Sequence, residues 1–262
     1  AFFLAGNTEF SSGNVAIIPI HGVITTTSEG SLTGGEITSD SIIESIDKAD
    51  NNPSIRAIIF DINSPGGSGV AADEVSQRIK ALNKTSISVI RDIGTSAAYW
   101  IASSTDHIFA NKMSFTGSIG VIGSYLDFSG LIKEYNVTYQ RYVSGEMKDM
   151  LSPFKETSEK ERAVFQKILD RARDLFVLEV AQNRNITLKK ANEFATGQVY
   201  LGIDAKEIGL VDSIGTKKDA IGFIEKKLNI TAVPVEYRQK KSLQELLSEL
   251  TSKNLVKYLN PS

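Results

Sequence analysis

IRAIIFDINSPGG, residues 55–67, is the stretch of sequence that decides the fold. Its first part, Ile55–Ile62, is mostly apolar, and a run of this length predicts a strand that is buried on both faces of a parallel sheet. A proline and two glycines follow at once and indicate a sharp turn. The next segment, Val70–Leu82, has apolar residues at helical spacing. Buried strand, turn and helix in this order form the repeating unit of α/β folds.

The same unit recurs along the first half of the chain. Val15–Ile20 and Ile87–Arg91 predict two further buried strands, and Thr38–Ala49 and Ser96–Ser103 predict helices. Strands that alternate with helices at this spacing predict an α/β fold with a largely parallel sheet and helices around it.

The second half of the chain is more helical. Ser158–Asn185 carries apolar residues at steps of four and predicts a long helix that faces the core. Leu188–Ala195 and Lys217–Leu228 predict shorter helices, and the glycine-punctuated segment Gly202–Gly215 is expected to return to the sheet. Leucines at helical spacing in the tail, Val235–Ser262, favour a helix that packs on the body or on a neighbouring chain. A membrane-surface helix is the alternative, although the tail lacks the basic face of a strong lipid binder.

No internal repeat or linker divides the chain, so residues 1–262 are predicted to form a single domain. Within it, residues 1–14 are an N-terminal stub and residues 236–262 a helical tail. The opening residues, AFFLAG, contain no Met and indicate either the remainder of a removed signal or anchor segment or a boundary of the chain. No apolar run reaches the length of about 18 residues that a membrane-spanning helix needs.

The composition narrows the functional classes. Lys and Arg number 29 and Asp and Glu number 31, for a net charge of −2, whereas a nucleic-acid binder needs a basic face. The absence of cysteine excludes disulfides, thiolate metal sites and cysteine nucleophiles. With two histidines and no H-E-x-x-H motif, the sequence predicts neither a metal site nor a cofactor.

Two glycine-containing turns carry candidate chemistry. Asn63–Gly67 follows a buried strand, and its small residues can present bare backbone N–H groups to a developing oxyanion. Phe115–Val121 is small and rich in hydroxyl groups, and a hydroxyl in it could bond to a lysine amine. An ordinary tight turn is the alternative interpretation of both segments.

Ser96 lies at the start of a predicted helix, which is entered from a short Gly94-Thr95 turn after a predicted strand. A nucleophilic serine is favoured there, because the helix dipole is positive and the N–H of Ala97 can help to hold an oxyanion. The alternative is that Ser96 or Thr95 is an N-cap. A serine nucleophile needs a base, and both histidines, His21 and His107, lie in apolar runs typical of core or edge positions. A desolvated lysine can serve instead, but residue type alone selects none.

Taken together, these segments resemble the short, single-domain signal peptide peptidases of bacteria and archaea, which are serine–lysine proteases. The resemblance covers residues 15–237 and implies the Clp-protease/crotonase-like fold, a superhelix of repeated β-β-α units with a largely parallel sheet and peripheral helices. Five stretches carry it in the order and at the spacing of the family: Asn63–Gly67, Gly94–Tyr99, Thr116–Val121, Ser144–Pro153 and Gly202–Gly215.

Carried over residue by residue, the resemblance implies that Ser96 is the nucleophile and that Lys148 is the general base. Ser118 falls on the serine whose hydroxyl orients the lysine amine. The family's oxyanion hole falls on Gly66, Gly67 and the N–H group of Ala97. A base of this kind must be buried, since an exposed lysine stays charged up to about pH 10.4; we therefore predict a depressed pKa for Lys148.

One stretch departs from the family pattern. The family usually has Ala-Ser-Gly-Gly-Tyr around the nucleophile, whereas this chain has alanine at both glycine positions, Ala97 and Ala98. The two added methyl groups affect the width of the substrate pocket, so a preference for small residues is not carried over.

The resemblance also implies the setting of the enzyme. Family members form dome- or ring-shaped homo-oligomers whose active sites lie against subunit boundaries. Their substrates are peptides, such as cleaved signal peptides and unfolded apolar segments. A membrane-associated protein is therefore expected, its catalytic domain on the extracytoplasmic side after loss of an N-terminal anchor.

Three other interpretations of the same sequence remain open. A crotonase-like enzyme acting on acyl-CoA would share the glycine turn but would not need Ser96 and Lys148 together. A histidine-dependent Clp-type protease would need a better placed histidine than this chain offers. An inert scaffold of the same fold is the third, and the presence of both dyad residues argues against it.

Overall fold

A largely parallel sheet forms the centre of the structure, which is a computed structural model and describes residues 13–27 and 35–237. The eight-stranded sheet has the order β10-β1-β4-β5-β6-β9, and β7 pairs with β5 and with β8. All of these pairs are parallel except β7 with β8. The strands are β1 Val15–His21, β4 Ala57–Ser64, β5 Thr85–Thr95, β6 His107–Ala110, β7 Phe115–Gly117, β8 Val199–Leu201, β9 Ser213–Ile214 and β10 Pro234–Glu236.

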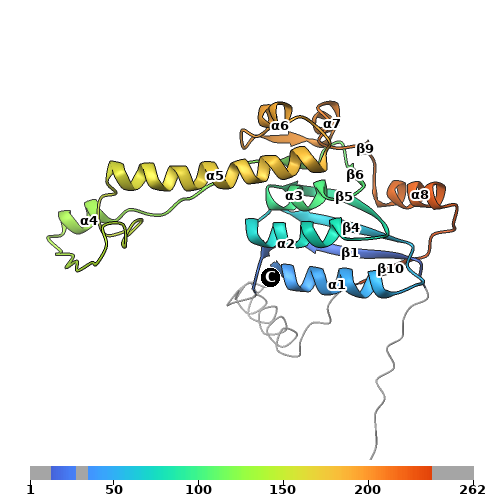
Figure 1. Cartoon of the computed structure of the whole chain (residues 1–262), viewed down its shortest axis with the longest axis horizontal. Coiled ribbons are helices and arrows are strands. Elements are labelled where there is room, and N and C mark those ends of the chain that lie inside the picture. The colour runs from blue at the N-terminus through green and yellow to red at the C-terminus, as the bar shows by residue number, and fades with distance from the viewer. Residues whose placement is uncertain (1–12, 28–34, 238–262) are drawn as a thin grey trace, which may run out of the picture.

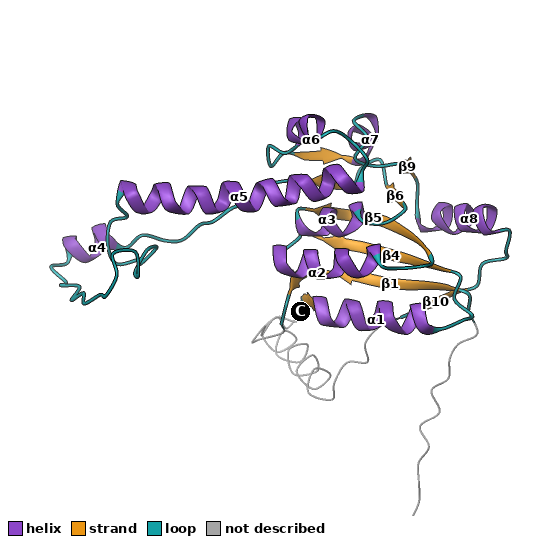
Figure 2. Cartoon of the chain, in the orientation of Figure 1, coloured by secondary structure: helices purple, strands orange, loops and turns teal. Residues whose placement is uncertain are grey.

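Helices cover both faces of this sheet (Figures 1 and 2). Along β4, Ile58 and Phe60 belong to the core cluster that includes α1, α2 and α3, whereas Ile59 between them packs with α8 on the other face. The predicted burial of this strand on both faces is confirmed, and so is the α/β fold class with a largely parallel sheet. The helices are α1 Ser39–Asn51, α2 Gly69–Lys80, α3 Ala97–Ser103 and α8 Lys217–Leu228, and a separate parallel pair is formed by β2 Val23–Thr25 and β3 Glu36–Thr38.

The longest helix, α5 (Glu159–Asn183), leaves the body of the protein (Figure 1). One face of its C-terminal half is buried, and Phe176 stacks on Trp100 of α3 with ring centroids 4.9 Å apart. Its N-terminal half extends beyond the sheet, and Ile168 is 51% exposed. The prediction that the whole helix faces the core is therefore wrong for this half, because no layer of the same chain covers its apolar stripe among the described residues.

Residues 121–158 and the first half of α5 form an arm that projects from the body (Figure 1). Apart from α5, the arm contains one short helix, α4 (Ser129–Glu134), and otherwise consists of turns and irregular backbone. Most of its side chains are exposed, including large apolar ones. A surface of this kind is typical of an interaction site rather than of a free monomer face.

The chain returns to the sheet after α5, as predicted for Gly202–Gly215. α6 (Leu188–Phe194) is followed by β8, by α7 (Gly202–Glu207) and by β9, which pairs with β6. The predicted tail, Val235–Ser262, does not begin as a helix, because Val235 and Glu236 belong to β10 beside β1. Residues 238–262 lie outside the described residues. The same holds for most of the N-terminal stub. Among residues 13–27 and 35–237, none of the helices combines the length and apolar composition that a bilayer crossing requires.

Tyr99 ties α3 to the loop after α7. Its side chain is fully buried, and its hydroxyl donates a hydrogen bond to the carbonyl oxygen of Leu210 at 2.8 Å. Burial raises the pKa of this hydroxyl, so that it remains a donor at every physiological pH.

Replacing Tyr99 with Phe should lower the free energy of unfolding by about 1 kcal/mol, because the Leu210 carbonyl loses its buried partner. Denaturant unfolding measures this loss. The matched control is Tyr142→Phe, since the Tyr142 ring is 90% exposed and its substitution should leave the unfolding midpoint unchanged. Equal midpoints for Tyr99→Phe and the parent would show that this hydrogen bond contributes nothing to stability.

Candidate active site

The register of three neighbouring strands brings the candidate residues together. β5 pairs with β7 so that Thr95 lies opposite Gly117, and the next residue of each strand is Ser96 or Ser118. Two parallel strands that end at the same level therefore place these two serines side by side. β4 pairs with the other edge of β5, and the turn after it lies against Ser96.

Ser96 has an unusual backbone conformation. Its φ is 55° and its ψ is −126°, a region that residues with a Cβ seldom occupy. Ser96 occupies the N-cap position of α3, as one interpretation of the sequence predicts, but its side chain makes no cap hydrogen bond to the helix. The N–H of Ser96 donates to the carbonyl oxygen of Gly117 at 2.9 Å, which anchors the turn to β7. A strained serine between a strand and a helix is the arrangement that exposes a nucleophilic hydroxyl.

The glycine turn after β4 packs directly on this serine. A Cβ on Gly66 would lie only 2.8 Å from the Ser96 Cβ, and φ is +104° there, so glycine is required for two reasons. The hydroxyl of Thr95 donates to the carbonyl oxygen of Pro65 at 2.9 Å and fixes the turn to β5. The sequence predicts this turn, and the contact explains its composition.

The three predicted oxyanion donors differ in what their N–H groups do. The N–H of Gly66 donates to the Ser64 hydroxyl at 3.1 Å and is therefore occupied. The N–H of Gly67 has no acceptor among the described residues, and Gly67 itself is exposed. Ala97 is the first residue of α3, where backbone N–H groups have no acceptor within the helix. Within the described residues, the N–H groups of Gly67 and Ala97 thus remain without a protein acceptor, although neither residue lines the pocket of Ser96, whereas Gly66 supplies space beside this serine.

Ser96 and Ser118 line one pocket of about 480 Å³. Both hydroxyl-bearing residues are half-buried, and Ser118 is held by its N–H, which donates to the carbonyl oxygen of Gln198 at 2.8 Å. The other lining residues come from the start of the arm, from α5 and from the segment after α6: Gly120, Val121, Ile122, Arg173, Ala195, Thr196 and Gly197.

Lys148 lies apart from this pocket. It is in a turn of the arm, where its N–H donates to the carbonyl oxygen of Gly145 at 3.1 Å, and its side chain is exposed. It does not line the Ser96 pocket, and the dry surroundings predicted for it are absent from the single chain. The structure therefore brings together the serines and the glycine turn but leaves the predicted base on the arm.

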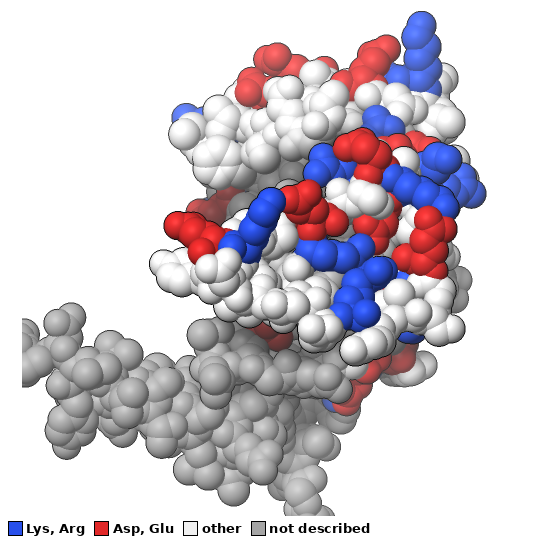
Figure 3. Space-filling model, turned by 90° about the vertical axis from the view of Figure 1, so that its left-hand side faces the viewer, with Lys and Arg blue, Asp and Glu red and all other residues white. Residues whose placement is uncertain are grey.

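An ion-pair network holds the turn that carries Lys148. The guanidinium of Arg141 donates to both carboxylate oxygens of the adjacent residue, Asp149, with Nη2 2.7 Å from Oδ1. Lys155 lies 3.5 Å from the same carboxylate and also pairs with Glu161. Seen from the side of the arm, acidic and basic side chains lie next to one another rather than in separate patches (Figure 3).

Glu161 connects this network to the start of α5. Its side chain is only 3% exposed and accepts a hydrogen bond from the N–H of Ser158 at 2.9 Å, while the Ser158 hydroxyl caps the helix. The hydrogen bond from Lys155, together with those from Ser158, lowers the pKa of Glu161 to about 2. The hydrogen bond from Arg141 likewise lowers the pKa of Asp149 to about 2. The turn is thus fastened to a rigid helix end.

Neither histidine reaches the Ser96 pocket. His107 stacks on Phe223 with ring centroids 4.5 Å apart, and burial lowers its pKa. Its Nε2 is 2.9 Å from the Ser213 hydroxyl. His21 lies at the end of β1, with Nε2 3.8 Å from the Asp61 carboxylate. Their places on strands of the sheet agree with the interpretation that they are core or edge residues.

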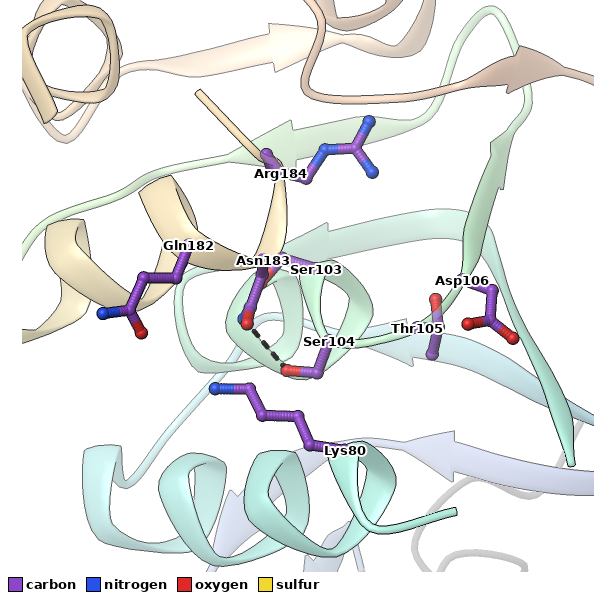
Figure 4. Close-up of a pocket in the computed structure, with 8 residues that line it drawn as sticks. All are labelled: Lys80, Ser103, Ser104, Thr105, Asp106, Gln182, Asn183 and Arg184. Atoms are coloured by element: carbon purple, nitrogen blue, oxygen red, sulfur yellow. Dashed lines mark hydrogen bonds between the residues drawn. The ribbon is translucent and has the colours of Figure 1, made fainter. Parts of the chain in front are cut away.

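A second pocket, of about 440 Å³, lies where α2, α3 and α5 end (Figure 4). Its polar side chains are bonded to one another: the Asn183 amide donates to the hydroxyls of Ser103 and Ser104, and Arg184 forms an ion pair with Asp212. This pocket joins three helix ends, and its lysine, Lys80, forms an ion pair with Glu179. Within the described ranges, no group of three or more acidic or histidine side chains is placed to hold a metal ion.

Sequence reasoning missed two features of this site. Arg173 lines the pocket, but the sequence pattern of its helix assigns it to a face exposed to solvent. The pairing of Arg141 with Asp149 is also missed, although the second residue directly follows Lys148 and could have drawn attention to it.

Comparison with known proteins agrees with this geometry. Residues 78–231 match the model of peptidase family S49. A protein of Enterococcus faecium, whose name assigns it to the signal peptide peptidases of the SppA type, is 34% identical over 87% of this chain and 68% of its own length. A protein of Methanocaldococcus jannaschii named as a protease is 30% identical over 72% of this chain and 61% of its own length. Protease 4 of Haemophilus influenzae is 32% identical over 82% of this chain, which spans only 35% of that protein.

Replacing Arg141 with Gln should raise the pKa of Asp149 from about 2 toward its ordinary value of 3.8, because the guanidinium hydrogen bonds are lost. The pKa of Asp149 is lower in the folded than in the unfolded protein. The interaction therefore stabilises the arm above about pH 4 and is lost as the pH falls toward 2. Carboxyl titration by NMR measures the shift.

The matched control for this titration is Lys160→Gln. It removes a cation from the same arm, but one that pairs with Glu146. An unchanged Asp149 pKa in Arg141→Gln would show that the network does not form in solution.

Proposed function

Because this chain belongs to peptidase family S49, we propose that it is a serine endopeptidase with Ser96 as its nucleophile and Lys148 as its general base. The observation that carries the proposal is the backbone of Ser96, which turns its side chain into a pocket shared with Ser118, against a turn that tolerates only glycine. A crotonase-like enzyme has no need of a strained serine at this place. An inert scaffold has no need of it either.

The proposed reaction uses two proton transfers at each stage. The neutral amine of Lys148 takes the proton of the Ser96 hydroxyl while the oxygen bonds to the substrate carbonyl carbon. The carbonyl oxygen becomes an oxyanion and accepts hydrogen bonds from the N–H groups of Gly67 and Ala97. The intermediate expels the amine of the new N-terminus, which receives the proton from the lysine. Water then gives a proton to the lysine and attacks the acyl-enzyme, and the departing Ser96 oxygen regains that proton.

The base must come from a second copy of the chain in this proposal. Lys148 is on an arm that carries it away from the Ser96 pocket of its own chain, and the arm exposes apolar surface that another subunit can bury. Repetition of such a head-to-tail contact closes a homo-oligomeric ring. The exposed apolar side chains of the arm include Ile122, Leu126, Leu131, Tyr135, Val137 and Tyr142.

The proposed substrates are extended apolar peptides, such as cleaved signal peptides. Val121 and Ile122 give the pocket an apolar side next to Ser96, and the name of the Enterococcus relative specifies signal peptides for that protein. Such peptides originate in a membrane, so we also propose that the protein works close to a bilayer, on its extracytoplasmic side. We also propose that the whole chain forms a single domain.

Ser96→Ala and Lys148→Ala should each lower casein hydrolysis by about 10³-fold or more, because each removes one half of the dyad. Mixing equal amounts of the two variants during assembly should restore about one quarter of the parent activity, since half of the serines and half of the lysines are intact and pair at random. Labelling of Ser96 by a fluorophosphonate reports the same pairing.

Two outcomes would contradict this account in different ways. Full activity of either single variant removes the dyad. An inactive mixture, with both variants properly assembled, places the serine and the lysine of one site on the same chain.

Gly66→Ala should lower kcat/KM by about 100-fold or more, because the new methyl group would lie 2.8 Å from the Ser96 Cβ and displace the nucleophile. The control is Gly69→Ala three residues further on, where an added Cβ meets no atom within 4 Å. Parent-like activity of Gly66→Ala would mean that the close approach to Ser96 is not needed for the reaction.

A further inference from the structure

The pocket that holds Ser96 and Ser118 is lined by one charged side chain among the described residues, that of Arg173. All other lining groups are hydroxyl-bearing, apolar or glycine. Arg173 is on the part of α5 that rejoins the body, and its side chain is about one third exposed. A permanent positive charge in the pocket of a serine nucleophile is a feature that the proposed dyad does not explain.

The guanidinium is fixed in place by the neighbouring chain segment. Its Nε donates to the carbonyl oxygen of Ala195 at 3.0 Å, and its Nη2 donates to Oδ1 of Asn192 on α6, also at 3.0 Å. Both acceptors are neutral, so they hold the group without cancelling its charge. The remaining contact is with Asp174, whose carboxylate is 3.4 Å away and 59% exposed to water.

We propose that the fixed positive charge of Arg173 favours the neutral, proton-accepting form of the Lys148 amine when the arm of a second copy places that amine beside Ser96. This inference rests on the proposed function, because it concerns the base of the same reaction. Arg173 acts on Lys148 and not on the substrate, so it is a positioning and tuning residue.

The physical basis is the repulsion of like charges. An ammonium group that enters a pocket already holding a guanidinium is destabilised, while the neutral amine is not. The hydroxyl of Ser118 can still orient the neutral amine. The acidic residues that accompany Lys148 on the arm do not offset the effect, because Glu146 pairs with Lys160 and Asp149 with Arg141.

The same guanidinium is less suited to binding a substrate carboxylate. Recognition of a carboxylate uses two parallel N–H groups of one guanidinium edge, and Arg173 already gives its Nε and an Nη2 hydrogen to Ala195 and Asn192. Glu193, the acidic residue of α6 next to Asn192, is exposed and does not line the pocket. With Nη1 directed to Asp174, three of the five N–H donors of Arg173 are used by the protein itself, whereas its charge still acts on the pocket.

The test is the pH dependence of kcat/KM for an apolar, uncharged peptide, whose acid limb reports the titration of the base in the free enzyme. In Arg173→Gln this limb should move to higher pH by about 0.5 to 1 unit, the size expected for loss of one partly screened charge at pocket distance. The rate at high pH should return to that of the parent. Arg173→Lys keeps the charge and should keep the limb.

A matched control removes a cation of α6 that does not line the pocket. Lys189→Gln, at an exposed position, should leave the limb where it is. Asp174→Asn removes the nearest negative charge and should move the limb the opposite way, by less, because that carboxylate is exposed. This variant keeps the inference testable if Arg173→Gln fails to assemble.

The outcomes separate this inference from the proposed function. If Ser96→Ala or Lys148→Ala retains activity, the proposed function fails whatever the limb does. If both residues are needed but the limb of Arg173→Gln coincides with that of the parent, only the role of Arg173 is overturned. A loss of equal size at every pH would also overturn it, since that result indicates a purely structural link between α5 and α6. A higher KM of Arg173→Gln that is confined to substrates with a carboxylate would likewise overturn the proposed role of Arg173, because it would indicate that the guanidinium binds substrate.

Discussion

The close approach of Gly66 to Ser96 is the constraint on which the rest of the site depends. Two neighbouring parallel strands, β4 and β5, end at the same level, and the turns that follow them touch. Contact at this distance leaves no room for a side chain on one turn and holds the serine of the other in a left-handed conformation. The sheet thereby holds the Ser96 hydroxyl against the glycine turn, and the surrounding hydrogen bonds maintain the strained backbone of this serine.

The body and the arm divide the chemistry between them. In the proposed mechanism, the body supplies the nucleophile, the oxyanion donors and a fixed positive charge, whereas the arm carries the base on a turn that is clamped by ion pairs. Neither part is a complete catalytic site. In the proposed mechanism, activity therefore depends on assembly, because the Lys148 amine of one chain lies apart from the Ser96 pocket of the same chain.

The sequence predicts the sheet and its turns because their signals are local. An apolar run predicts a buried strand, and consecutive glycines predict a tight turn. The strand bounds are less well predicted: β4 extends over Ala57–Ser64 rather than Ile55–Ile62, and β5 continues to Thr95. The arm could not be predicted in this way. The apolar stripe of α5 shows that the helix is covered by something, but periodicity does not tell whether the cover is the same chain or another. The sequence does not predict the role of Arg173 either, because this role depends on which distant segment of the chain folds back beside it.

The Ser96 Oγ to Lys148 Nζ distance in the assembled protein tests the account most directly. An experimental structure of the oligomer, by crystallography or electron cryomicroscopy, provides it. The account predicts that the arm of one subunit brings its amine to about 2.6–3.2 Å from the serine hydroxyl of the next, shielded from water. An oligomer in which every Lys148 remains exposed, far from every Ser96, would contradict it.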